Sequence, residues 1–231
     1  MKPDVVELTA GALTLGYSGA LNRALPEFTY VPSNLLAAGA LLGLARACGC
    51  DADDLGLSAS GVGRGLAAGA VGSAAACAGL VAAMALPKTR GLFVEERDET
   101  RTETVYHALV RIPVGTALAE ELIFRGALLG ILARRRPWWQ AAAVSSALFG
   151  VWHVLPTHDS LDRSRAAVEV RGRPWARTAA VVGTVAVTTV AGFGLSLLRM
   201  RSRSIAAPVA VHAAVNLVGY LGGGLLARRD R

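Results

Sequence analysis

Seven long apolar segments constrain the fold of this 231-residue chain more than any other feature. A helix needs about 20 predominantly apolar residues to cross the hydrocarbon core of a membrane. Runs of this kind lie at about Val5–Leu25, Val31–Cys48, Val62–Leu86, Ile112–Ala133, Trp138–Leu155, Ala176–Leu198 and Ile205–Leu226. Only 18% of the residues are charged, whereas soluble domains carry about 25%. We therefore expect an all-α protein, a polytopic transmembrane bundle of about seven to eight helices that forms one domain over residues 1–231.

Two polar stretches interrupt the apolar segments. Lys88–Arg111 is expected to form an amphipathic helix at the membrane surface or, alternatively, a further span that would change the topology. Pro156–Arg177 is expected to be an extramembrane loop. With seven spans, both stretches lie on the side opposite the N-terminus, where basic residues are somewhat more numerous. The arginines stand beside the apolar segments, which favours lipid headgroups as their partners over nucleic acid. Gly65 and Gly69 form a G-x-x-x-G pattern that predicts close helix packing.

The fourth segment contains two adjacent carboxylates and a guanidinium, which are costly inside a membrane. Glu121 and Arg125 are four residues apart, so they share a helix face and can pair. Glu120 points about 100° away on the helical wheel and has no obvious partner within its own helix. A carboxylate in this position is suited to proton transfer. The alternative is a structural Glu–Arg cluster that only holds helices together.

Further polar residues lie on two other apolar segments. His153 follows Phe149 by one turn near the end of the fifth segment, and His212 precedes Asn216 by one turn in the seventh. Taken singly, these residues are typical of interfacial or helix-packing positions. Together with Glu120, they are expected to converge on one water-filled cavity. Such a set supplies a base and oxyanion donors, or metal ligands, and both point to hydrolysis by activated water.

Several common catalytic classes lack their motif in this chain. It has no H-E-x-x-H, no G-x-S-x-G and no P-loop sequence. Its three cysteines include one Cys-x-Cys pair, Cys48 and Cys50, without the second pair or histidines of a zinc site. These absences argue against zincin proteases, α/β-type serine hydrolases and nucleotide-driven pumps.

The order of the polar residues resembles that of the CPBP intramembrane proteases, also called the CAAX protease or Abi family. Their motifs E-E-x-x-x-R, F-x-x-x-H and H-x-x-x-N correspond here to Glu120-Glu121-x-x-x-Arg125, Phe149-x-x-x-His153 and His212-x-x-x-Asn216. The motifs lie within a core of about residues 100–226. The N-terminal half of the chain has no matching motif.

The resemblance implies a role for each motif residue. Glu120 and His153 would activate the hydrolytic water, and His212 and Asn216 would stabilise the oxyanion. Glu121 and Arg125 would brace the site together with Phe149. The family is classed as metalloproteases, although a metal-free mechanism is also argued for it. If a metal such as zinc is present, its candidate ligands are Glu120, His153 and His212, but we favour a mechanism without tightly bound zinc.

The resulting hypothesis is an intramembrane endopeptidase of a membrane-associated or lipidated peptide or protein. Its expected partners are this substrate and the lipid bilayer, without nucleic acid, in a bacterial cell membrane. By analogy with prenyl-protein proteases, the stretches 88–111 and 156–177 would be cytoplasmic. Two alternatives are a non-catalytic immunity or scaffold protein of the same fold, and a transporter or proton relay. Substrate, metal dependence, oligomeric state and pathway are left open by the sequence.

Overall fold

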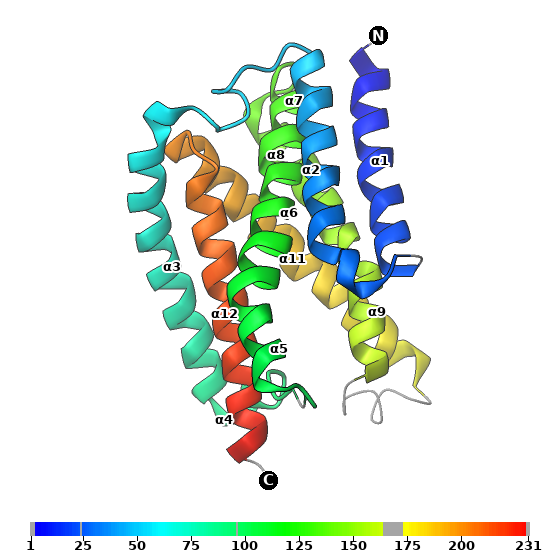
Figure 1. The fold of residues 1–231 in the computed structure, drawn as a ribbon, viewed down its shortest axis with the longest axis vertical. Coiled ribbons are helices and arrows are strands. Elements are labelled where there is room, and N and C mark those ends of the chain that lie inside the picture. Colours follow the sequence, from blue (N-terminus) through cyan, green and yellow to red (C-terminus); the bar gives the residue numbers. More distant parts are fainter. Residues whose placement is uncertain (1–2, 24, 96, 164–172, 230–231) are drawn as a thin grey trace.

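The computed structural model describes residues 3–23, 25–95, 97–163 and 173–229, which form a bundle of helices without a β-strand (Figure 1). This arrangement confirms the predicted all-α fold. Two short 3-10 turns are η1 (Glu27–Thr29) and η2 (Ala59–Gly61), and one central helix continues from residue 101 to 133. The other helices are α1 (Pro3–Arg23), α2 (Tyr30–Ala47), α3 (Val62–Ala85), α4 (Pro87–Arg90), α8 (Trp138–Trp152), α9 (Val154–Arg163), α11 (Pro174–Ser202) and α12 (Ala206–Arg229).

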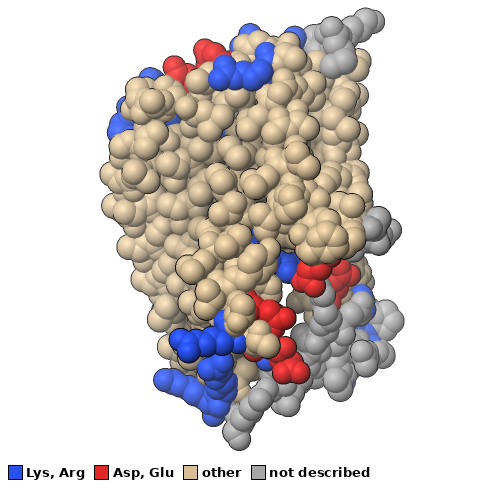
Figure 2. Space-filling view, viewed as in Figure 1, with Lys and Arg blue, Asp and Glu red and all other residues tan. Residues whose placement is uncertain are grey.

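Four helical stretches in the described part of the chain are long and apolar enough to cross a membrane: Glu27–Ala47, Ala59–Ala85, Trp175–Ser202 and Ala206–Arg229. The other three predicted spans are also helical, but α1 is less apolar, α8 has only 15 residues, and the central helix carries the Glu–Glu–Arg cluster. Figure 2 shows a broad uncharged belt between two charged ends. Apolar side chains such as Val71, Val187 and Val190 are exposed in the middle of α3 and α11, as expected for lipid-facing positions. The chain is an integral membrane protein.

The central helix departs from regular α-helical geometry over much of its length. It consists of α5 (Arg101–Tyr106), η3 (His107–Leu118), α6 (Ala119–Glu121), η4 (Leu122–Leu128) and α7 (Leu129–Ala133), of which η3 and η4 are π-helical. Pro113 lies inside η3 and has no N–H to donate, so the wider turns accommodate a residue that would break a regular helix. π-Helical turns occur frequently at functional sites. Glu120 and Glu121 lie between the two π-helical segments.

The stretch predicted as one amphipathic helix, Lys88–Arg111, is helical only at its two ends. Residues 91–95 and 97–100 instead run across the end of the bundle, and we refer to them as the strap. Contacts with α12 hold the strap: Arg97 Nη1 donates to the Tyr220 carbonyl at 2.8 Å, and a Cβ at Gly223 would lie 2.7 Å from the Phe93 carbonyl oxygen. Tertiary packing therefore overrides the local helical pattern in this segment.

The stretch predicted as a loop, Pro156–Arg177, is also partly helical. The helix α9 extends through residue 163 and α11 begins at Pro174, whereas 164–172 lie outside the described residues. The Thr157 hydroxyl donates to the His153 carbonyl, one turn earlier, as in a regular helix. The prediction that both polar stretches lie at one end of the molecule holds for their described parts, since α4, α5 and α9 are at the end opposite the N-terminus (Figure 1).

Small residues allow α3 and α12 to approach closely, as the G-x-x-x-G pattern predicts. A Cβ added at Gly69 would lie 2.9 Å from the Ala210 Cβ, and one added at Gly72 would lie 2.8 Å from Val211 Cγ2. Helices in lipid associate through such packing because the surrounding tails are as apolar as the side chains. Since α12 carries His212 and Asn216, this contact also sets the position of both residues.

We predict that Gly69→Val separates α3 from α12 and lowers the stability of the protein by about 1–3 kcal/mol, the usual effect of overpacking. The measurement is the thermal unfolding of purified protein in detergent. Gly79→Val is the matched control, because a Cβ at Gly79 on the same helix meets nothing within 4 Å. Equal unfolding temperatures for the two variants would contradict the role given to Gly69.

Candidate active site

A buried ion pair lies at the centre of the helix bundle. Glu121 and Arg125 are both fully buried, and Arg125 Nη1 donates to Glu121 Oε1 at 2.9 Å, as their spacing of four residues predicts. The guanidinium also stacks on the ring of Phe149 from α8, with its carbon 4.2 Å from the ring centroid. An aromatic face attracts a cation most strongly where water is excluded. The ion pair therefore connects the central helix to α8.

His212 from α12 completes this cluster. Its Nδ1 lies 2.7 Å from Glu121 Oε1, the same oxygen that accepts from Arg125. Because an ionised carboxylate only accepts hydrogen bonds, Nδ1 carries the proton and Nε2 faces the other way. The ion pair thus fixes both the orientation and the tautomer of the imidazole.

Glu120 lies beside the opposite nitrogen of this imidazole. Its Oε2 is 3.9 Å from His212 Nε2, which is too long for a direct hydrogen bond but suits a bridging oxygen. Glu120 is only 4% exposed, and Oε2 has no hydrogen-bond partner among the described residues. A buried polar atom without a partner is costly in a folded protein. This carboxylate is therefore arranged to receive a water molecule or a substrate group.

His153 is the C-terminal cap of α8 and adjoins the cluster through Phe149. Its Nδ1 lies 2.7 Å from the Phe149 carbonyl oxygen, which can only accept, so Nε2 keeps its lone pair. The Phe149 ring is 4.6 Å from the His153 ring and 5.9 Å from the His212 ring, centroid to centroid. No hydrogen bond or ion pair joins His153 to Glu120 among the described residues, so their joint action on a water stays a prediction.

Asn216, the remaining predicted site residue, lines a cavity of about 720 Å³ between the strap and the site. Thr116 and Ile112 from η3 and Val215 from α12 line the same cavity. Asn216 lies one turn after His212, and Thr116 lies one turn before Glu120, so the cavity comes within one helical turn of the buried cluster. Figure 2 shows the molecule hollowed at this end, with acidic side chains nearby.

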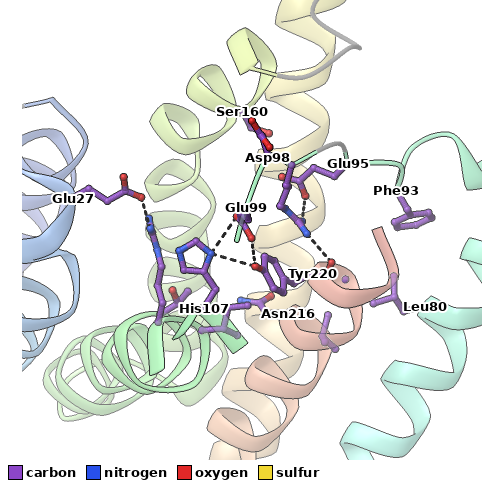
Figure 3. Close-up of a pocket in the computed structure, with 16 residues that line it drawn as sticks. Glu27, Leu80, Phe93, Glu95, Asp98, Glu99, His107, Ser160, Asn216 and Tyr220 are labelled. Atoms are coloured by element: carbon purple, nitrogen blue, oxygen red, sulfur yellow. Dashed lines mark hydrogen bonds and ion pairs between the residues drawn. The ribbon is translucent and has the colours of Figure 1, made fainter. Parts of the chain in front are cut away.

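Hydrogen bonds and ion pairs hold the strap over this cavity (Figure 3). The Arg97 guanidinium lies over the Tyr220 ring, 4.1 Å from its centroid, and the Tyr220 hydroxyl donates to Glu99. His107 Nδ1 lies 3.2 Å from Glu99 Oε1 and 3.3 Å from the Tyr220 hydroxyl. The wall of the cavity near the strap is therefore charged and polar.

The candidate metal ligands do not form a metal-binding group in this geometry. Across the described part of the chain, no three His, Cys, Asp or Glu side chains lie close enough together to hold a metal ion. The nearest approach among these three residues is that of His212 Nε2 to Glu120 Oε2, at 3.9 Å, and His153 does not join them. The donor set of Glu120, His153 and His212 does not fit a resident zinc ion, which needs about three protein ligands in one shell.

Two residues of α2 support the site, although the sequence motifs do not include them. Asn34 is fully buried, donates from Nδ2 to the Gly115 carbonyl at 3.0 Å and accepts from the Tyr17 hydroxyl at 2.9 Å. The Tyr30 hydroxyl lies 3.1 Å from the Thr116 hydroxyl. The signal in the sequence was the amide of Asn34 inside an apolar segment, where an unpaired polar group is costly.

Gly192 of α11 provides the space that the ion pair occupies. A Cβ at this position would lie 2.8 Å from Arg125 Nη2 and 3.1 Å from Phe149 Cδ1. Both neighbours are buried in a packed core, so neither can move away at low cost.

We predict that Gly192→Ala displaces Arg125, lowers stability by about 1–3 kcal/mol and reduces activity in parallel. The matched control is Gly194→Ala, since a Cβ at Gly194 on the same helix meets nothing within 4 Å. Unfolding temperature and substrate turnover are measured for both variants. A stable, fully active Gly192→Ala protein would show that Arg125 does not depend on this space.

Comparison with known proteins gives one match. The family model described as type II CAAX prenyl endopeptidase Rce1-like matches residues 102–218, which are about half of the chain. The matched range begins in α5 and ends in α12, and it includes every residue of the three motifs. No curated protein and no solved structure matches the chain. On the strength of this match, which extends from the central helix to the histidine of α12, the chain belongs to the Rce1-like family of type II CAAX prenyl endopeptidases, a family of CAAX-type intramembrane proteases.

Proposed function

We propose that this protein is an intramembrane endopeptidase that hydrolyses a peptide bond of a membrane-associated or lipidated peptide or protein. One observation carries the proposal: the buried Glu120 carboxylate has an unpartnered oxygen, and this oxygen faces an imidazole that a buried ion pair orients. A preorganised base beside a potential donor is the arrangement that peptide hydrolysis by water requires. The nearby cavity supplies a route for water and substrate.

In the proposed mechanism, Glu120 removes a proton from a water molecule as its oxygen adds to the scissile carbonyl carbon. The carbonyl oxygen becomes an oxyanion, which His212 Nε2–H and the Asn216 carboxamide stabilise. This donation requires the imidazolium form of His212, in which Nδ1 donates to Glu121 and Nε2 donates to the oxyanion. Glu120 then transfers its proton to the leaving amine. His153, with a lone pair on Nε2, is a second base near the site.

The family name specifies prenylated CAAX proteins as substrates of its members, and a lipidated substrate is consistent with the position of the site inside a lipid-facing bundle. We propose that such a substrate reaches Glu120 through the cavity beneath the strap. We further propose that the strap side is cytoplasmic and that the protein resides in a bacterial cell membrane, since the composition is rich in alanine, glycine and arginine.

We predict that Glu120→Gln abolishes cleavage, because glutamine keeps the size of the side chain but cannot accept a proton. The loss of a general base lowers turnover by about 100-fold or more. The measurement compares membranes from cells that produce wild-type protein, Glu120→Gln or Asp53→Asn at matched levels, with new peptide termini mapped by mass spectrometry. Asp53 is the control carboxylate, since it is exposed in the loop between α2 and α3.

Termini found with wild type and Asp53→Asn, but not with Glu120→Gln, would establish the hydrolase and identify its substrate. Identical termini in all three membranes would refute the catalytic proposal. If the cellular phenotype of wild type also survived in Glu120→Gln but not in Arg125→Leu, a non-catalytic immunity or scaffold role would replace it. Ion flux in proteoliposomes that His153→Ala alters, without any peptide product, would instead identify a transporter or proton relay.

We predict that the protease needs no bound zinc, because the candidate ligands do not meet in one shell. Purified protein is dialysed against a strong zinc chelator and then assayed on a peptide that reproduces the mapped cleavage site. Activity is expected to equal that of a mock-dialysed sample. A loss that added zinc restores, accompanied by stoichiometric zinc in the purified protein, would overturn this prediction.

A further inference from the structure

The hydroxyl of Thr116 differs in its hydrogen bonding from the hydroxyls of other helical threonines in this protein. Thr14, Thr184 and Thr188 each donate to the carbonyl oxygen one turn earlier in their own helix. Such a bond satisfies the hydroxyl locally and leaves it without a role between helices. Thr116 instead bonds across to another helix, where its Oγ1 lies 3.1 Å from the hydroxyl of Tyr30 at the start of α2.

The position of Thr116 relates this hydroxyl to the candidate active site. Thr116 lines the cavity, and Glu120 follows it by one turn on the same face of the central helix. Thr116 is therefore the cavity-lining residue of the central helix that is nearest in sequence to Glu120.

Several contacts fix the position of Tyr30 beside Thr116. The Arg111 guanidinium lies over the Tyr30 ring, 4.4 Å from its centroid, and pairs with Glu27. One turn along α2, Asn34 fixes the Gly115 carbonyl next to Thr116. Gly115 permits this approach, since a Cβ there would lie 2.7 Å from Val31 Cγ2. The hydroxyl pair is thus preorganised by both helices.

We propose that Thr116 is a further catalytic residue, which holds the lytic water for Glu120, and that Tyr30 is the positioning residue that orients Thr116. This inference rests on the proposed function. The Tyr30 phenol donates to Thr116 Oγ1, and the Thr116 hydroxyl donates to one lone pair of the water. The second lone pair attacks the carbonyl carbon, and one water proton passes to Glu120. Tyr30 and Thr116 keep their own protons, so the step is balanced.

Four substitutions separate the hydroxyl from the shape of the side chain. Thr116→Val keeps the branched shape and removes the hydroxyl, whereas Thr116→Ser keeps the hydroxyl. Tyr30→Phe removes the phenol oxygen and keeps the ring beneath Arg111. Thr188→Val is the matched control, since its hydroxyl bonds only within its own helix. Thermal unfolding of each purified protein in detergent shows whether it is folded.

The experiment first maps the termini produced by wild type, Glu120→Gln and these variants in membranes, and then measures turnover of a quenched-fluorescent peptide that reproduces the mapped site. Thr116→Val is expected to lower kcat by about 10- to 100-fold while KM changes little, as for a group that acts on the reacting water. Thr116→Ser and Thr188→Val are expected to stay near wild type. Tyr30→Phe is expected to lower kcat by about 5- to 10-fold, the effect of one lost hydrogen bond.

The double variant Tyr30→Phe/Thr116→Val tests whether Tyr30 acts through Thr116. If it does, the double variant has the kcat of Thr116→Val alone, because the effects of coupled residues do not add. A wild-type kcat for Thr116→Val, a change in KM alone, failure of serine to preserve kcat, or additive effects in the double variant would each overturn the inference. If Glu120→Gln produces the same termini as wild type, the proposed function fails first, and the two failures are therefore distinguishable.

Discussion

The ion pair between Glu121 and Arg125 is the interaction on which the candidate site depends. Both side chains are fully buried in a bundle surrounded by lipid, where removing one partner would leave an uncompensated charge at a cost of about 3–5 kcal/mol. The surrounding elements enclose this pair: α8 contributes the Phe149 ring, α11 the space at Gly192 and α12 the His212 imidazole. The orientation of the His212 imidazole thus follows from the need to stabilise a buried charge.

The helices and the ion pair could be predicted from the sequence because both follow from local spacing. Apolar segments must be helical in lipid to satisfy their backbone, and residues four apart share a helix face even though Leu122–Leu128 is π-helical. The strap and the pairs Tyr30–Thr116 and Asn34–Gly115 could not be predicted in this way. They depend on which helices become neighbours, and no periodicity within one segment contains that information.

The two histidines of the site have different chemical capacities, which the motifs alone do not distinguish. A backbone carbonyl binds Nδ1 of His153, so its Nε2 can accept a proton. The Glu121 carboxylate binds Nδ1 of His212, and the Glu120 carboxylate lies 3.9 Å from its Nε2, so acidic groups flank both sides of this ring. The resemblance assigned His153 as the partner of Glu120, whereas the geometry brings His212 nearest to it. The Phe149 ring between the two imidazoles keeps these environments separate.

Polar groups on different membrane helices can meet only where the helix backbones approach closely. Glycines provide this approach at each contact that builds the site: Gly69 for α3 with α12, Gly115 for η3 with α2, and Gly192 for α11 with Arg125. None of these glycines takes part in the chemistry, yet a single methyl group at any of them would meet an atom within 3 Å. Since packing replaces the hydrophobic effect between helices in lipid, the small residues determine the geometry that the charged residues then use. The catalytic geometry of such a bundle is therefore as sensitive to its glycines as to its carboxylates.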